Sequence, residues 1–136
     1  KTALNKKDSY KEYLQNIYGN SPSKTHLDLS KLEILRLNTN YLTRMRFCKL
    51  DGELELVTKG DQNNCPPGFK PWFLHPLKVA NKDLHIIFGH WADLKGKTGV
   101  TNITAIDTGC VWGHKLSALR LEDGKFFSYD RINLQK

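Results

Sequence analysis

The spacing of apolar residues divides the chain into a helical first part and a strand-rich remainder. Residues 8–19 and 30–43 place Leu, Ile and Tyr side chains at helical intervals. Ser9 and Ser30 are each followed three residues later by Glu, which is the spacing of a capping box at a helix start. The pattern therefore predicts two amphipathic helices at the beginning of the chain.

Two later stretches have the pattern of β-hairpins. Residues 46–57 contain two short apolar runs separated by Asp51-Gly52, a dipeptide typical of a two-residue type I′ turn. With that turn, Phe47 and Leu54 would share one face of the hairpin. Residues 116–129 repeat the arrangement around Asp-Gly.

Two single apolar runs, residues 84–89 and 103–106, each end abruptly in a polar turn that contains Gly. We interpret them as strands whose carboxyl ends form one wall of a site, because ligands gather past strand ends in layered sheets. Residues 58–76 are rich in Pro and Gly and are expected to be a loop, held to the body of the protein by Trp72 and Phe73.

The predicted inventory is α+β, with two amino-terminal helices followed by mainly antiparallel strands and hairpins. A chain of 136 residues suits a single domain or sub-domain, with a helical region at 1–45 and a mainly β region at 46–136.

Composition narrows the class of protein only in part. The balance of 21 Lys and Arg against 14 Asp and Glu gives a net charge of +7, which favours anionic partners such as nucleic acid or nucleotide polyphosphates. No apolar run approaches the roughly 18 residues of a membrane span. The three cysteines form no CxxC pair, so we expect a reduced, cytoplasmic protein rather than a disulfide or zinc scaffold.

Five motifs occur in an order that resembles one enzyme family, the bacterial symmetrical bis(5′-nucleosyl)-tetraphosphatases of the metallophosphoesterase superfamily. The resemblance is to the carboxyl-terminal half of these enzymes. The motifs are Thr43-Arg44-Met45-Arg46-Phe47-Cys48, Lys70-Pro71-Trp72-Phe73, Phe88-Gly89-His90-Trp91, Asp107-Thr108-Gly109-Cys110-Val111-Trp112-Gly113 and Leu119-Arg120-Leu121-Glu122-Asp123.

The resemblance implies a four-layer α-β-β-α sandwich and hydrolysis of diadenosine tetraphosphate to two ADP by metal-activated water. The metal would be a pair of divalent ions, manganese, cobalt or magnesium. The family's GDxHG, GDxxxxG and GNHD motifs belong to its amino-terminal half and do not occur in these residues. We therefore expect this chain to need that missing half as a partner, to bind the metals incompletely and to be inactive alone.

Two residues at the predicted strand ends are candidates for the chemistry. His90 matches a metal-ligand position of the family, and its alternative is a histidine that caps a strand end. Asp107 could orient His90 or contact the attacking water. Its alternative is an Asx turn that closes onto Gly109.

Four further residues are candidates for substrate binding. Arg44 and Arg46 would present guanidinium groups to the tetraphosphate from one face of an extended segment, unless they are structural. Trp91 and Trp112 could stack on adenine, unless they belong to the core. Cys110 lies near His114, but the family uses metal-activated water, so a cysteine nucleophile is disfavoured.

Three alternatives to this interpretation remain open. The chain could be a non-enzymatic basic module that binds nucleotides or RNA, although no RNA-binding motif supports this. It could be a fragment of a PPP-type protein phosphatase, the related class within the superfamily. Open strand edges could also pair two copies into a homodimer.

Overall fold

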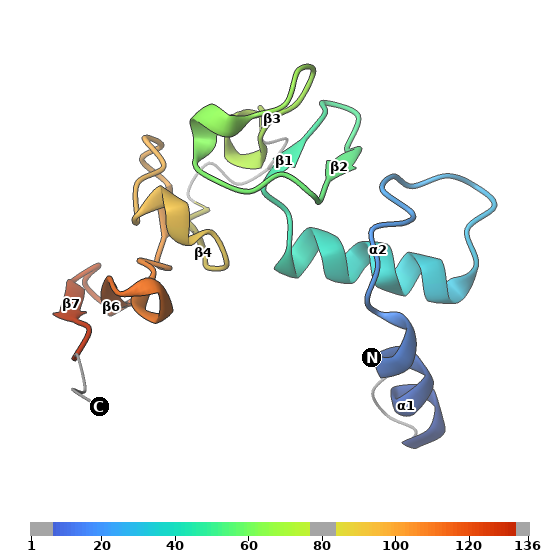
Figure 1. Cartoon of the computed structure of the whole chain (residues 1–136), viewed down its shortest axis with the longest axis horizontal. Coiled ribbons are helices and arrows are strands. Elements are labelled where there is room, and N and C mark those ends of the chain that lie inside the picture. The colour runs from blue at the N-terminus through green and yellow to red at the C-terminus, as the bar shows by residue number, and fades with distance from the viewer. Residues whose placement is uncertain (1–6, 77–83, 133–136) are drawn as a thin grey trace. The chain divides into compact units, whose positions relative to one another are not determined.

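The computed structural model describes residues 7–76 and 84–132. The chain divides into two compact units, of which the first comprises residues up to 59 together with 65–72. The second comprises residues 60–64 and those from 73 onward. Figure 1 shows the elements of each unit in chain order, and each unit is described by itself. The single-domain interpretation stays a prediction.

Helix α1 spans Lys7–Asn16. It begins before the predicted cap, so Ser9 lies inside the helix and the capping box predicted there is wrong. The helix is tied to α2 by a hydrogen bond of 2.8 Å between the hydroxyls of Tyr13 and Thr39.

Helix α2 spans Lys31–Thr43 and has the predicted capping box. The backbone N–H of Glu33 donates to the Ser30 hydroxyl at 3.3 Å, and the Ser30 N–H donates to the Glu33 carboxylate at 2.9 Å. These bonds satisfy donors that a helix start would otherwise leave unpaired. The predicted beginning and end of this helix are confirmed.

The first unit also contains a three-stranded antiparallel sheet of order β2-β1-β3. Its strands are β1 (Phe47–Cys48), β2 (Leu54–Glu55) and β3 (Lys70–Pro71). Strand β3 lies in the segment that we expected to be a loop. Proline has no N–H to donate, and the next residue, Trp72, donates its N–H to the Arg46 carbonyl at 3.0 Å, as the register of β1 and β3 places them opposite each other.

The turn between β1 and β2 differs from the predicted one. The N–H of Lys49 donates to the Glu53 carbonyl, so three residues rather than two form the loop. Only Gly52 among them has a positive φ, of 90°. This is the pattern of a type I turn followed by a left-handed residue. The extra residue changes the register, and Leu54 pairs with Cys48 rather than sharing a face with Phe47.

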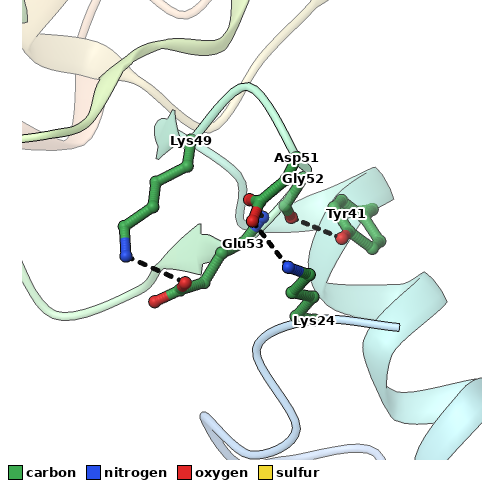
Figure 2. A network of polar contacts seen from close by, with 6 residues as sticks. All are labelled: Lys24, Tyr41, Lys49, Asp51, Gly52 and Glu53. Atoms are coloured by element: carbon green, nitrogen blue, oxygen red, sulfur yellow. Dashed lines mark hydrogen bonds and ion pairs between the residues drawn. The ribbon is translucent and has the colours of Figure 1, made fainter. Parts of the chain in front are cut away.

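Polar contacts fasten this turn to the neighbouring segments (Figure 2). The Tyr41 hydroxyl donates to the Gly52 carbonyl, and the Lys24 ammonium donates to the Asp51 carboxylate, each at 2.5 Å. Lys49 pairs with Glu53 at 2.9 Å. Beneath the turn, Leu37, Cys48 and Leu54 form a buried cluster against which Trp72 packs. The predicted packing role of Trp72 is thus confirmed.

The second unit is organised around two short strands, β4 (Ile86–Phe88) and β5 (Ile103–Ala105). They run parallel, with Ile86 opposite Ile103 and Phe88 opposite Ala105. Both were predicted as strands from their apolar runs. The Phe73 ring lies 6.1 Å from the Phe88 ring and is 3% exposed, so its predicted packing role is also confirmed.

The second hairpin consists of β6 (Lys115–Leu119) and β7 (Phe126–Asp130). Its antiparallel register pairs Ser117 with Ser128. Four single-turn 3₁₀ segments complete the described structure: Gln62–Asn64, Trp72–Leu74, Ala92–Leu94 and Cys110–Trp112.

Two helices and several small sheets agree with the predicted α+β class. The four-layer sandwich stays a prediction. None of the helices in the described residues is long and apolar enough to cross a membrane.

Candidate functional site

His90 follows β4 directly after Gly89, in a left-handed backbone conformation with φ of 68°. His90 is exposed to solvent. A side chain with a Cβ pays roughly 1–2 kcal/mol for this conformation relative to the right-handed one. Residues held in such conformations concentrate at functional sites. Among the described residues other than glycine, Lys95 is the second with a positive φ, of 51°, so this conformation is one that His90 shares with one neighbour in the following loop.

Asp107 follows β5 at the corresponding position. Phe88 and Ala105 are opposite each other in the parallel pair, and His90 and Asp107 each come two residues later. The N–H of Ile106 donates to the Phe88 carbonyl at 2.9 Å, so the pairing continues up to this point. His90 and Asp107 therefore both lie just past the carboxyl-terminal ends of the same two paired strands.

The Asp107 carboxylate accepts a hydrogen bond of 3.0 Å from the Gly109 N–H. This is the Asx turn considered from the sequence. One carboxylate oxygen forms the turn, and a carboxylate can accept several further bonds. The turn therefore explains why Asp suits this position, and a role beside His90 stays a prediction.

The two loops that follow the strands pack against each other. Gly109 is buried with φ of 77°, and a methyl group there would lie 3.6 Å from the Ala92 Cβ and 3.1 Å from the His114 ring. A methyl group on Gly96 would lie 3.4 Å from the Thr108 methyl. These distances show that the segments after His90 and Asp107 lie close to each other.

Trp91 belongs to the core. It is 1% exposed, its ring lies 5.8 Å from the Phe73 ring, and its indole N–H donates to the Gly60 carbonyl at 2.8 Å. A ring buried in this way offers no face to a nucleotide base. The prediction that Trp91 stacks on substrate is therefore replaced by its alternative, a core residue.

Trp112 has the opposite environment. It is 74% exposed, at the end of the 3₁₀ segment Cys110–Trp112. Gly109 and Gly113 bound this segment with φ of 77° and 96°. The segment thus holds an exposed indole on the loop that begins at Asp107, and stacking of Trp112 on a base stays a prediction.

Arg44 has a structural environment in the first unit. It lies at the C-cap of α2 rather than on an extended segment, which removes the argument that Arg44 and Arg46 share one face. Its guanidinium donates to the Gly19 carbonyl at 3.1 Å, to Asn40 at 2.9 Å and to Asn20 at 2.8 Å. Arg44 therefore fastens the loop before α2 to the end of that helix.

Arg46 directly precedes β1 and is partly buried. Its carbonyl takes part in the sheet through the bond from Trp72. Arg46, like Arg44, lies within the first unit, whereas His90, Trp91, Asp107 and Trp112 lie within the second. A phosphate contact by Arg46 stays a prediction.

A row of hydroxyl groups beside Asp107 was not predicted. The Thr108 hydroxyl lies 2.7 Å from that of Ser117, which lies 2.8 Å from that of Ser128. The Thr108 hydroxyl also donates a hydrogen bond of 2.7 Å to the Lys115 carbonyl. The row ties the loop after Asp107 to the β6–β7 hairpin. The sequence could have indicated this row only through the two serines, 117 and 128, which hydrogen-bond when they lie opposite each other in the hairpin. That pairing can be recognised only once the register of the hairpin is known.

Comparison with curated proteins finds relatives that all carry the same name. A bis(5′-nucleosyl)-tetraphosphatase, symmetrical, of Marinomonas sp. (strain MWYL1) is 52% identical over 123 residues, which are 90% of this chain and 44% of the relative. The namesake from Cellvibrio japonicus (strain Ueda107) is 51% identical over 115 residues, 85% of the chain and 42% of the relative. That of Pseudomonas entomophila (strain L48) is 45% identical over 120 residues, 88% and 42% respectively.

The chain is a homologue of part of the symmetrical bis(5′-nucleosyl)-tetraphosphatases. It spans less than half the length of these curated relatives. No family model matches the chain. The resemblance inferred from the five motifs is thus confirmed for most of the chain's own length.

The side chains of a metal centre do not come together within the described part of this homologue of the tetraphosphatases. No three His, Cys, Asp or Glu residues of 7–76 and 84–132 form a group that could hold a metal ion. His90 and Asp107 share a sheet edge, but two such residues do not make a dimetal site, which needs ligands around both ions. A complete metal centre therefore does not fit the described residues alone.

Proposed function

We propose that this chain contributes one wall of the active site of a hydrolase that cleaves diadenosine tetraphosphate symmetrically, with water, to two ADP. The observation that carries the proposal is His90, exposed and left-handed at the strand edge where Asp107 also leaves the sheet. The names of the relatives support the substrate class.

His90 is proposed as one imidazole ligand of a divalent metal whose other ligands come from polypeptide outside this chain. Asp107 is proposed to orient His90 or to accept a hydrogen bond from water at the same edge. A divalent metal would supply charge stabilisation and a more acidic water for anhydride hydrolysis. The proposed setting is bacterial and cytoplasmic.

The substrate contacts proposed from this chain are Trp112 and Arg46. The exposed Trp112 indole suits stacking on an adenine. Arg46 would contact the polyphosphate through its guanidinium group. We exclude Trp91 and Arg44, because the first is buried and the second bonds to three neighbours within its own unit.

The test is a chimera in which these residues replace the matched segment of the Marinomonas relative, assayed for ADP release from diadenosine tetraphosphate. His90→Asn removes the imidazole but suits the backbone, since Asn tolerates left-handed conformations. Asp107→Asn keeps an oxygen that can accept the Gly109 bond and removes the charge.

The expected loss for His90→Asn is about 100-fold or more in kcat/KM, because changes even to groups that only support a metal ligand cost 10–100-fold. His26→Asn, at an exposed histidine outside the loops that follow β4 and β5, is the matched control and should change little. Equal activity of His90→Asn and the unmodified chimera would remove His90 from the site.

The 136-residue chain alone, supplied with manganese, should not hydrolyse diadenosine tetraphosphate. Turnover above background would contradict the proposal that the active site requires a further polypeptide.

A further inference from the structure

The β6–β7 hairpin carries basic residues at both of its ends. At the turn end, the Arg120 guanidinium forms an ion pair with Asp123 and lies 5.6 Å from the centre of the Phe127 ring. The Lys125 ammonium lies 5.2 Å from the centre of the same ring. The two cations at the turn end are therefore engaged within the hairpin itself.

The other end of the hairpin adjoins the loop that carries Trp112. Lys115 forms an ion pair with Asp130 at 2.9 Å, and these two residues are the last pair of the strand register. Arg131 follows, and its backbone N–H donates to the His114 carbonyl at 3.1 Å. Arg131 is exposed, and within residues 7–76 and 84–132 its guanidinium has no ion pair, hydrogen bond or ring contact.

The Arg131 guanidinium lies against the Trp112 loop. A methyl group on Gly113, the residue next to Trp112, would lie 3.7 Å from a terminal nitrogen of Arg131. Trp112 is 74% exposed. The loop begins at Asp107, whose carboxylate accepts the bond from Gly109. An exposed aromatic ring and an exposed guanidinium are thus neighbours on one side of the candidate site.

This combination suits one class of ligand, a nucleotide. A guanidinium group can donate two parallel hydrogen bonds to phosphate oxygens, and it stays charged at physiological pH. An aromatic side chain offers a face on which a base can stack. Because one ribose joins the base of a nucleotide to its first phosphate, neighbouring side chains can contact both.

We propose that Arg131 binds a phosphate of the substrate whose adenine stacks on Trp112. This inference rests on the proposed function, and it adds a residue that lies outside all five sequence motifs. It gives the second unit a phosphate-binding group of its own, whereas Arg46 lies within the first unit. A phosphate contact of this kind is made before the reaction as well as during it, so it acts mainly on binding.

The test uses the chimera with the Marinomonas relative and compares Arg131→Gln with the unmodified protein. Isothermal titration calorimetry in EDTA measures the Kd for diadenosine tetraphosphate without metal or turnover. Arg131→Gln should raise this Kd about tenfold or more, because it removes hydrogen bonds between two charged groups. With manganese present, KM should rise by a similar factor, while kcat changes by less than about threefold.

Two further variants separate a phosphate contact from a general effect of charge or structure. Arg131→Lys keeps the charge but loses the planar fork, so it should recover part of the lost affinity. Lys125→Gln removes the same charge from the turn end of the same hairpin and should leave Kd within about twofold. The bond from Arg131 to His114 comes from the backbone, so the side-chain variants should keep the circular dichroism spectrum.

Four outcomes would overturn the proposal. They are an unchanged Kd in Arg131→Gln, an equal loss of affinity in Lys125→Gln, a lower kcat with KM and Kd unchanged, and no binding by the unmodified chimera in EDTA, since the proposed contacts need no metal. An inactive chimera that binds the substrate and loses affinity in Arg131→Gln would count against the proposed hydrolysis alone. An active chimera that requires His90 but not Arg131 would count against this inference alone.

Discussion

Replacing each of two tryptophans by phenylalanine should distinguish a core tryptophan from an exposed one by its effect on stability. Trp91 and Trp112 each follow a strand and a Gly-containing turn, but Trp91 is 1% exposed and Trp112 is 74% exposed. Trp91→Phe and Trp112→Phe are therefore the same chemical change in opposite environments. We expect the first to destabilise the second unit and the second to leave its stability unchanged.

The magnitude follows from two losses at Trp91. The bond of 2.8 Å from the indole N–H to the Gly60 carbonyl disappears, which costs about 1 kcal/mol because Gly60 is only partly buried. The smaller ring also leaves a void beside Phe73, at a cost of about 1–2 kcal/mol. The sum is a loss of about 2–3 kcal/mol in the free energy of unfolding. Trp112→Phe should stay within about 0.5 kcal/mol.

Native-state hydrogen exchange in increasing urea measures the opening free energy of residues 86–106, and it does not require the two units to unfold together. Far-UV circular dichroism of each variant before the titration checks that the starting structure is retained. The difference between the two variants is the quantity to compare, because both lose an indole and gain a phenyl ring.

Equal destabilisation by the two substitutions would refute the assignment of Trp91 to the core. So would a Trp91→Phe variant that is as stable as the unmodified chain. In either case the indole of Trp91 would again become available as a candidate for stacking on substrate.

Two further predictions concern the first unit. Ser30→Ala should lower the stability of the unit by about 1 kcal/mol, because it removes the N-cap of α2, and Thr25→Ala is an exposed control measured in the same urea titration. The bond from the Lys24 side chain, with a backbone bond from Glu53, lowers the pKa of the Asp51 carboxyl. A carboxyl with a lowered folded-state pKa stabilises the turn fully above its unfolded-state pKa, and this contribution is lost as pH falls through the folded-state value. In an acid titration of stability, Asp51→Asn should therefore show a smaller decrease than the unmodified chain, and identical curves would contradict the ion pair.

Most elements whose signals are local were predictable from the sequence, but the same Ser-to-Glu spacing at Ser9 and Glu12 did not mark the start of α1. The α2 capping box depends on two residues three apart, Ser30 and Glu33, and it was placed correctly. The two hairpins and the strands β4 and β5 follow from short apolar runs between turn residues. The sequence could not choose between a two-residue and a three-residue loop at Gly52, because Asp-Gly suits both. That single residue decided which side chain faces Leu54.

Features that depend on distant partners were not predictable. Strand β3 contains Pro71, which argues against a strand, and its pairing with β1 appears only when residues 47 and 71 meet. Arg44 bonds to Gly19, 25 residues away, so its motif alone could not reveal a structural role. The burial of Trp91 likewise depends on Gly60 and Phe73, which come from a Pro- and Gly-rich segment. For the site, the sequence indicated His90 and Asp107, and the parallel pairing of β4 and β5 places both past the carboxyl-terminal ends of these strands.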